Sequence, residues 1–373
     1  MAKTPNGFEI ISAFEQFSPK HLAMEGDKIG LQIGTLNKPV SNIMIALDVL
    51  EEVVDEAIEK DVQLIIAHHP LIYRPLQKIA TDQASGRIVE KLIKNDIALY
   101  VAHTNLDVAD GGVNDWLAEA LGLQNTKVLV PTHETTLKKL AVFVPLEAEM
   151  RVKEALGNAG AGHIGNYSHC TFTAEGTGTF LPGDGTNPHI GTSGKLEAVS
   201  EVRIETVFPA ELERKVVQAM IKAHPYEEVA YDIYELANAQ PALGLGRIGE
   251  LPEEMTLEAF ALHAKAAFDV PSLRVVGGLS DKVRKVAVLG GDGNKYINSA
   301  KFMGADVYVT GDMYYHTAHD AMMLGLNIVD PGHNVEKVMK EGVAQYLRGY
   351  STKQKWQVDV FASTIHTDPF TFM

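Results

Sequence analysis

The sequence contains two similar segments, and this repeat constrains the fold more than any other feature. At an offset of 243 residues the apolar positions match without gaps, pairing Ile43 with Val286, Ile45 with Val288, Ala57 with Ala300, Leu64 with Val307 and Ile66 with Val309. Each segment holds two apolar runs around a helix-like stretch, which is the pattern of a β-α-β unit. Any two such units align to some degree, but this match continues into the elements that follow. We therefore expect an α/β fold with two duplicated lobes.

The elements expected in the two lobes follow from these apolar patterns. The first lobe should contain helices over residues 7–17, 51–60 and 87–95 and buried strands over 42–47, 62–67 and 97–102. The second should contain a helix over 318–324, a strand over 326–329 and a helix over 335–347. Strands this apolar are typical of a parallel sheet covered on both faces.

The stretch between the lobes has a different pattern. Strands are expected over 140–144, 170–180, 202–208 and 228–235, with helices over 147–159 and 210–224. The order β-α-β-β-α-β is the ferredoxin-like arrangement. A loop rich in Gly, Pro, Asn and Ser, Gly183 to Gly194, is expected at a hairpin tip. The predicted domains are 1–130, 131–240 and 241–373, the middle one an inserted α+β domain that either binds a small effector or acts as a spacer.

Composition limits the classes of protein to consider. The 373 residues are 46% hydrophobic, enough for large cores, and no stretch approaches the roughly 20 apolar residues of a membrane span. Cys170 is the single cysteine, which argues for a reducing cytoplasm. A net charge of -15 would repel a phosphate backbone, so nucleic acid is not expected as a partner. We expect a cytoplasmic protein that acts on a small molecule.

Candidate metal ligands follow the predicted strands. His68 and His69 end one apolar run, Asp107 follows the next strand, and His333 and Glu336 lie three residues apart at the start of a helix. Because the carboxyl ends of parallel strands meet at one sheet edge, these side chains should converge in the cleft between the lobes. Taken alone, an adjacent His pair is as often an ordinary loop feature. Three imidazoles with two carboxylates suit two borderline divalent cations better than calcium.

Two further histidines are candidates for proton transfer. His103 follows the strand over 97–102, and His316 follows the strand end of the second lobe. Either can act as a general acid or base in metal-assisted hydrolysis. The alternative for both is a supporting role, in which the imidazole orients a carboxylate or packs in the core.

Four segments resemble the NIF-three-like family, whose bacterial members are often labelled GTP cyclohydrolase 1 type 2 homologs. They are IIAHHPLIY, VAHTNLDVADGGVNDWLAEALGL, GADVYVTGDMYYHTAHDA and GLNIVDPGHNVE. The resemblance implies a dinuclear site of His68, His69, Asp107, His333 and Glu336, with zinc as the expected ion and iron or manganese as alternatives. It also implies a PII/CutA-like inserted domain and a ring-shaped homohexamer.

The predicted function is therefore a dinuclear divalent-metal-dependent hydrolase, and the family label implies opening of a purine ring. The alternative is a non-enzymatic hexamer that binds metal as a regulator or delivers it. A structural metal site is closed by protein ligands, whereas a catalytic one keeps an open position. Five ligand residues shared by two ions leave open positions, which favours catalysis or metal transfer.

Overall fold

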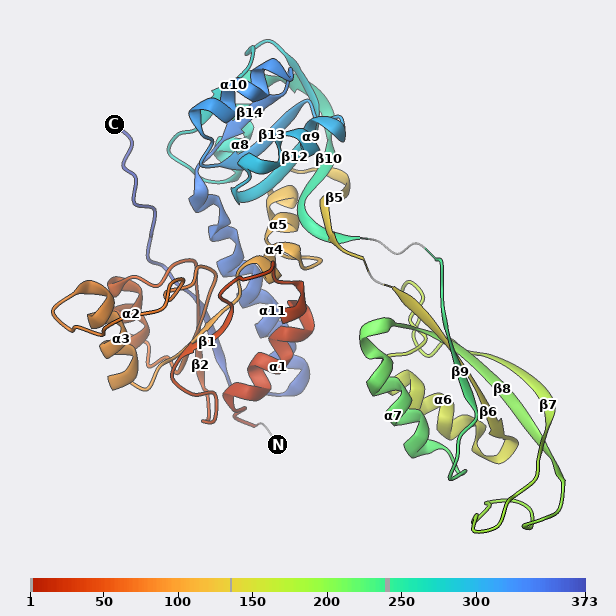
Figure 1. Cartoon of the computed structure of the whole chain (residues 1–373). Coiled ribbons are helices and arrows are strands. Elements are labelled where there is room, and N and C mark those ends of the chain that lie inside the picture. The colour runs from red at the N-terminus through yellow and green to blue at the C-terminus, as the bar shows by residue number, and fades with distance from the viewer. Residues whose placement is uncertain (1–2, 135, 239–241) are drawn as a thin grey trace. The chain divides into compact units, whose positions relative to one another are not determined.

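The computed structural model of the chain describes residues 3–134, 136–238 and 242–373 (Figure 1). It divides the chain into two compact units, Met1–His133 with Leu243–Met373, and Glu134–Ala242. We call the first unit the core and the second the inserted domain. The inserted unit begins three residues after the expected 131 and ends two residues after the expected 240, because β5 (Gln124–His133) and β10 (Leu243–Thr256), which flank it, belong to the core.

The first lobe of the core is a five-stranded sheet in the order β1-β4-β3-β2-β15. Its strands are β1 (Gly30–Ile33), β2 (Asn42–Ala46), β3 (Leu64–Ala67), β4 (Ala98–Val101) and β15 (Asp359–Ala362). All neighbours are parallel except β1, which is antiparallel to β4. Strands β2, β3 and β4 are buried almost throughout, which explains why they appear in the sequence as continuous apolar runs.

The second lobe is a six-stranded sheet in the order β11-β14-β13-β12-β10-β5. Its strands are β5 (Gln124–His133), β10 (Leu243–Thr256), β11 (Arg274–Val276), β12 (Lys282–Asp292), β13 (Val307–Gly311) and β14 (Asn327–Asp330). Strand register confirms the duplication, since Ile43 pairs with Leu64 in the first lobe and Val286 pairs with Val307 in the second. In both lobes an antiparallel edge strand, β1 or β11, closes the sheet beside β4 or β14.

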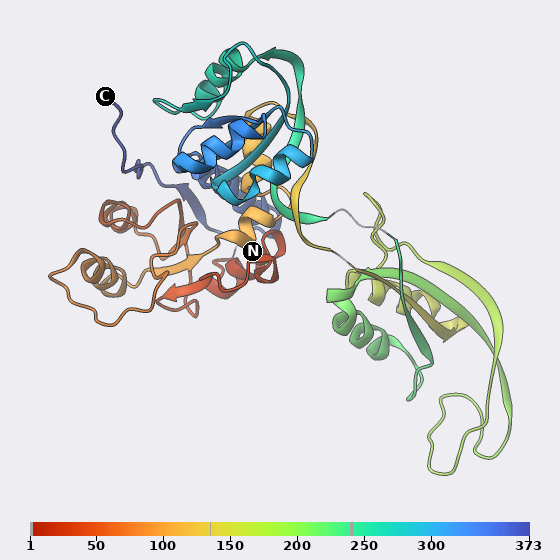
Figure 2. The same ribbon diagram turned by 45° about the horizontal axis from the view of Figure 1, so that its top comes forward.

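Helices cover both faces of each sheet (Figures 1 and 2). Helices α1 (Gly7–Phe17), α5 (Val113–Ala120) and α11 (Val338–Gln354) share one apolar cluster with residues of both sheets, so this cluster is the central core of the unit. The outer face of the first sheet carries α2 (Glu51–Glu59) and α3 (Ala84–Lys94), and that of the second carries α9 (Ile297–Phe302) and α10 (Tyr315–Met323). Helix α8 (Leu257–Ala267) packs on the central cluster.

Strands β5 and β10 are the main elements that the sequence did not reveal. They pair with each other over most of their length, from Gln124 with Glu250 to His133 with Leu243. Half of β5 is exposed, and β10 contains several glycines and Pro252, so neither strand shows an apolar run or a regular alternation. In sequence, β5 directly precedes the inserted domain and β10 directly follows it.

The inserted domain contains β6 (Leu137–Pro145), α6 (Glu149–Asn158), β7 (Phe172–Phe180), β8 (Glu197–Pro209), α7 (Glu213–Ala223) and β9 (Tyr231–Glu235). Its sheet has the order β7-β8-β6-β9 with all pairs antiparallel. Both helices pack on one face of this sheet, where Val142, Ile204, Leu156 and Met220 are fully buried. Within the described part of the domain, no helix lies on the other face of the sheet (Figure 1). None of the described helices is long and apolar enough to cross a membrane.

Candidate metal centre

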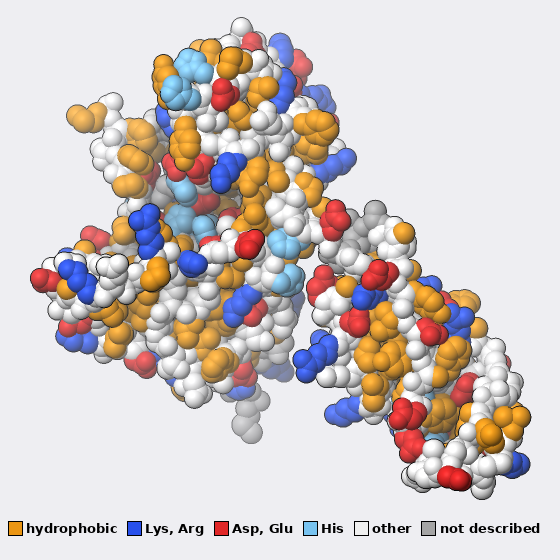
Figure 3. Space-filling view, in the orientation of Figure 1, with side chains coloured by type: hydrophobic (Ala, Val, Ile, Leu, Met, Phe, Trp, Pro, Cys, Tyr) orange, Lys and Arg blue, Asp and Glu red, His pale blue; other side chains and the backbone are white. Residues whose placement is uncertain are grey.

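The candidate ligands lie where the strands of the two sheets end. His68 and His69 directly follow β3, His103 follows β4, and Asp107 lies on the short helix α4 (Thr104–Val108) rather than in a loop. His333 and Glu336 lie on a 3-10 turn, η5 (His333–Lys337), that precedes α11, so the expected helix start over 335–347 is divided into two elements. Figure 3 shows histidine side chains in the hollow between the two lobes of the core.

The duplication explains why one carboxylate comes from each lobe. Ala98 pairs with Leu64 and Asn327 pairs with Val307, so Asn327 is the counterpart of Ala98 at an offset of 229 residues. At that offset Glu336 is the counterpart of Asp107. The two acidic side chains therefore approach the site from equivalent positions. Asp107 lies one short turn after β4, and Glu336 lies one short turn after β14, the corresponding strand of the second lobe.

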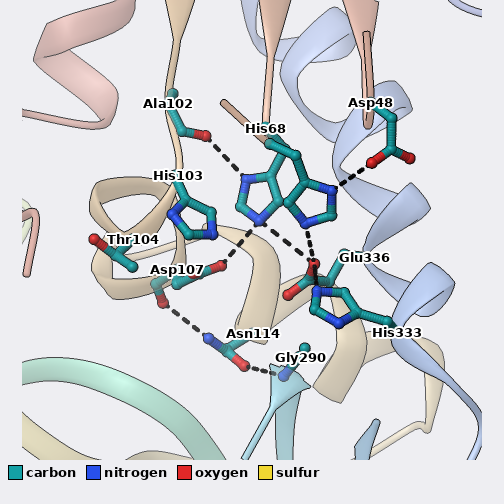
Figure 4. A network of polar contacts seen from close by, with 12 residues as sticks. Asp48, His68, Ala102, His103, Thr104, Asp107, Asn114, Gly290, His333 and Glu336 are labelled. Carbon is teal, nitrogen blue, oxygen red and sulfur yellow. Dashed lines mark hydrogen bonds and ion pairs between the residues drawn. The ribbon is translucent and has the colours of Figure 1, made fainter. Parts of the chain in front are cut away.

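Glu336 lies at the centre of the group (Figure 4). Its Oε2 atom is 3.0 Å from Nε2 of His69, 3.2 Å from Nε2 of His333 and 3.7 Å from Nε2 of His68. The side chain is almost completely buried. Gly291, with φ of +64°, permits this approach, because a Cβ atom there would lie 2.8 Å from Oε1 of Glu336.

Every imidazole of the group has its Nδ1 atom held by an oxygen. His68 Nδ1 lies 2.9 Å from the carbonyl oxygen of Ala102, and the Nδ1 atoms of His69, His103 and His333 lie 2.7, 3.0 and 2.6 Å from carboxylates. Those three carboxylates belong to Asp48, Asp27 and Asp312 respectively. With Nδ1 donating to these oxygens, Nε2 is the ring atom left to face the other candidate ligands, and this arrangement is characteristic of histidines that ligate metal.

Two buried atoms of the group have no hydrogen-bond partner in the part of the chain that the structure describes. They are Nε2 of His68 and Oδ1 of Asp107, which lie 3.5 Å apart. In the neutral imidazole with Nδ1 donating to the carbonyl oxygen of Ala102, Nε2 has a lone pair. That lone pair faces the lone pairs of Oδ1 of Asp107, and two acceptors facing each other repel. A cation between these atoms would satisfy both, so the residues present fit a bound metal ion.

The electrostatics of the protein alone reflect this crowding of acidic and basic groups. Burial lowers the pKa of His69, but the hydrogen bonds to Asp48 and Glu336 outweigh burial and raise that pKa to about 10. Burial also lowers the pKa of His333, but its contacts with Glu336 and Asp312 outweigh burial and raise that pKa to about 9. Burial raises the pKa of Asp107 to about 6. Protons and metal cations therefore compete for the same atoms.

The ligand atoms form three overlapping groups within which all atoms lie inside 4.8 Å of one another. The groups are His68, His69 and His103; His69, His333 and Glu336; and His68, Asp107 and Glu336. All five residues expected as ligands are thus brought together, and His103 joins them. Since Glu336, His68 and His69 each belong to two groups, the arrangement has the donors for more than one adjacent cation.

His316 lies elsewhere. It is exposed on α10, where its ring packs edge-on against Tyr315, and it belongs to none of these groups. The helix begins at Tyr315, so His316 lies in its first turn rather than at the strand end itself. The structure therefore does not bring His316 together with the candidate ligands.

Several residues that organise the site were not identified from the sequence. Asp48 and Asp312 follow β2 and β13, so their position after a strand was an available signal, whereas Asp27 follows no apolar run. Asn114 on α5 is fully buried; it donates to the carbonyl of Asp107 and accepts from the amide of Gly290 at the end of β12 (Figure 4). Asn114 therefore ties the strand ends of the two lobes together.

The fold and the site define a class of protein: a duplicated α/β core with a histidine and carboxylate cluster at the strand ends of both lobes. A family model described as Duf34/NIF3 (NGG1p interacting factor 3) matches residues 5–369. The chain therefore belongs to the Duf34/NIF3 family, which confirms the resemblance seen in the sequence motifs.

Close relatives match over the whole chain. A protein of Bacillus subtilis (strain 168) named GTP cyclohydrolase 1 type 2 homolog is 64% identical over 373 residues, 100% of both chains. A solved structure described as a Bacillus cereus protein related to NIF3 is 67% identical, covers 100% of both chains and has a TM-score of 0.94. A Staphylococcus aureus protein of known structure is 34% identical, covers 99% of both chains and has a TM-score of 0.78.

Proposed function

We propose that the protein is a hydrolase that depends on two divalent metal ions held by His68, His69, Asp107, His333 and Glu336. The observation that carries the proposal is the common orientation of the imidazoles, each with Nδ1 fixed by an oxygen and Nε2 directed at the two carboxylates. Zinc is the preferred ion, because imidazole and carboxylate donors suit borderline cations.

The ligands divide naturally between two positions. His68 and Asp107, whose facing atoms lack partners, would hold one ion, and His69 and His333 would hold the other. Glu336, close to Nε2 of three histidines, would be shared. When bound, such a pair of cations lowers the pKa of a shared water and polarises the bond to be hydrolysed.

His103 is placed to move a proton. Its side chain is 30% exposed, more open than the buried His68 beside it, and Asp27 holds its Nδ1 atom. Burial lowers the pKa of His103, but the hydrogen bond to Asp27 and the nearby acids raise it overall. A protonated Nε2 at the open side of the cluster can donate to a leaving group.

The name of the relatives supports one substrate class. The term GTP cyclohydrolase in that name implies hydrolytic opening of a purine imidazole ring, so GTP is the first substrate to test. The imidazole ring of a purine offers a nitrogen lone pair that such cations would polarise, and its carbon between two nitrogens is the electrophile that water would attack.

The test combines metal analysis with an activity screen. The zinc-loaded protein is incubated with GTP, other purine nucleotides and cyclic nucleotides, with and without a chelator, and ring opening is followed by the loss of the purine absorption band. We expect chelator-sensitive turnover that falls at least about 100-fold in His103→Gln while two ions per chain are retained. Full metal occupancy with no hydrolysis of any compound would support the alternative, a non-enzymatic metal-binding regulator or delivery scaffold.

A further inference from the structure

The inserted domain contains a cavity that none of the proposed chemistry uses. It has a volume of about 640 Å³ and lies on the face of the sheet opposite α6 and α7. Its floor is formed by β6, β7 and β8, and its other walls by residues 182–190 and 226–230. Ligand pockets in proteins have volumes of roughly 300–1,000 Å³, so this cavity can hold a small organic molecule.

Strand β7 keeps the floor of the cavity clear of side chains. Ala174, Gly176 and Gly178 pair with Arg203, Glu201 and Val199, and they occupy alternate positions between Phe172 and Phe180. A Cβ atom on Gly176 would meet nothing within 4 Å, so it would project into open space. Glycine weakens a strand, and one in a strand interior often marks a close approach by a ligand.

The cavity contains a buried carboxylate. Glu201 is 8% exposed, and its Oε1 atom accepts a hydrogen bond of 2.9 Å from the hydroxyl of Tyr226. Its Oε2 atom has no hydrogen bond among the described residues, and a Cβ on Gly178 would lie 2.1 Å from it. The glycine thus makes room for this carboxylate, which has acceptor capacity left for a ligand.

Aromatic rings and further acids surround Glu201. Tyr226 lies 6.1 Å from Phe180 between ring centroids, and Phe143 also lines the cavity. Glu227 and Glu228 are among the lining residues, whereas Arg203, the lining arginine, is paired with Glu205 at 2.9 Å. Aromatic faces beside a buried carboxylate attract an organic cation, and the surplus of acids opposes a phosphate or carboxylate ligand.

We propose that this cavity is a binding site for a small organic cation with a flat apolar body, such as an aromatic amine or amidine. The positive group pairs with Oε2 of Glu201, and the apolar body lies over Gly176 between the rings of Phe143, Phe180 and Tyr226. The site is separate from the metal ligands, so it gives the inserted domain the role of an effector-binding domain.

The test uses three compounds of nearly equal shape with the full-length, metal-loaded protein. Benzamidine is the cation, benzamide the neutral analogue and benzoate the anion, and binding is measured by calorimetry and by saturation-transfer NMR of the compound. We expect benzamidine to bind at least about tenfold more tightly than benzamide, the equivalent of about 1.4 kcal/mol, with no binding of benzoate.

Two variants and one control variant locate the site. Glu201→Gln keeps an acceptor for Tyr226 and should remove the preference for benzamidine, whereas Glu235→Gln, an exposed acid on β9 outside the cavity, should leave it unchanged. Gly176→Val should abolish binding by filling the floor while the metal content stays at the parent value. The proposal is overturned if the three compounds bind equally, if Glu201→Gln binds benzamidine like the parent, or if a second copy of the chain proves to fill the cavity.

Discussion

Replacement of Glu336 by glutamine tests the assignment of the shared ligand. The amide has nearly the same size as the carboxylate, but it has no charge and offers one oxygen. Glu336 is almost fully buried with Nε2 atoms of two histidines at 3.0 and 3.2 Å, so no solvent can compensate for the lost charge. Loss of a buried hydrogen-bonded acid costs about 1–3 kcal/mol of stability, which a core of this size should tolerate.

The expected effect on metal binding is larger than that of an outer residue. Residues that merely orient a ligand change metal affinity by about 10–100-fold when replaced. Glu336 belongs to two of the three ligand groups, so Glu336→Gln should weaken zinc binding by at least about 100-fold, or about 2.7 kcal/mol, and should affect both ions.

The assay is competition with a chromophoric zinc chelator, and the control is Glu341→Gln. Glu341 lies on α11, is 53% exposed and pairs with Arg348 at 2.7 Å, away from the ligands. We expect parent-like affinity in Glu341→Gln and loss in Glu336→Gln. Two zinc ions bound with parent affinity in Glu336→Gln would refute its role as the shared ligand.

Three further predictions follow from other parts of the core. Asp48→Asn, which disturbs the oxygen that holds Nδ1 of His69, should weaken zinc binding about 10–100-fold, while Asp55→Asn on the exposed side of α2 should not, as measured by the same competition assay. Glu56 accepts hydrogen bonds from Ser363 and Thr364. Burial would raise the pKa of Glu56, but these bonds and Lys60 lower that pKa from 4.5 to about 2. The contribution of Glu56 to stability is therefore complete above about pH 4.5 and is lost as the pH falls towards 2. In urea titrations Glu56→Gln should therefore be less stable than the parent by about 1–3 kcal/mol at pH 7, and a gap that stays constant down to pH 3 would contradict this assignment. Replacing residues 134–242 by a short Asn-Gly turn should leave a folded core that still binds zinc, because His133 and Leu243 are paired neighbours on β5 and β10; an insoluble or metal-free product would show that the core needs the inserted domain.

The parts of the fold that the sequence revealed are those in which one local pattern determines the structure. Strands β2, β3, β4 and β13 are buried on both faces, so they appear as apolar runs, and the two copies share these runs. Strands β5 and β10 depend on pairing between segments more than 100 residues apart in sequence, which no local pattern records.

The candidate ligands could be identified because strand ends converge in a parallel sheet, but their supporting contacts could not. Asp27 reaches His103 across 76 residues of sequence, and Asp312 reaches His333 across 21. Such partners are brought together by the packing of elements within each lobe, which no local pattern records. His316 shows the limit of this reasoning, because it lies on the helix that follows a strand end and its side chain is exposed.

The central claim is that His68, His69, Asp107, His333 and Glu336 hold two divalent cations in one cluster. Diffraction data from a zinc-loaded crystal, collected on either side of the zinc absorption edge, test it directly. We expect two anomalous peaks per chain, each within bonding distance of these side chains, with Glu336 in contact with both. A single peak, or peaks that lie away from this cluster, would contradict it.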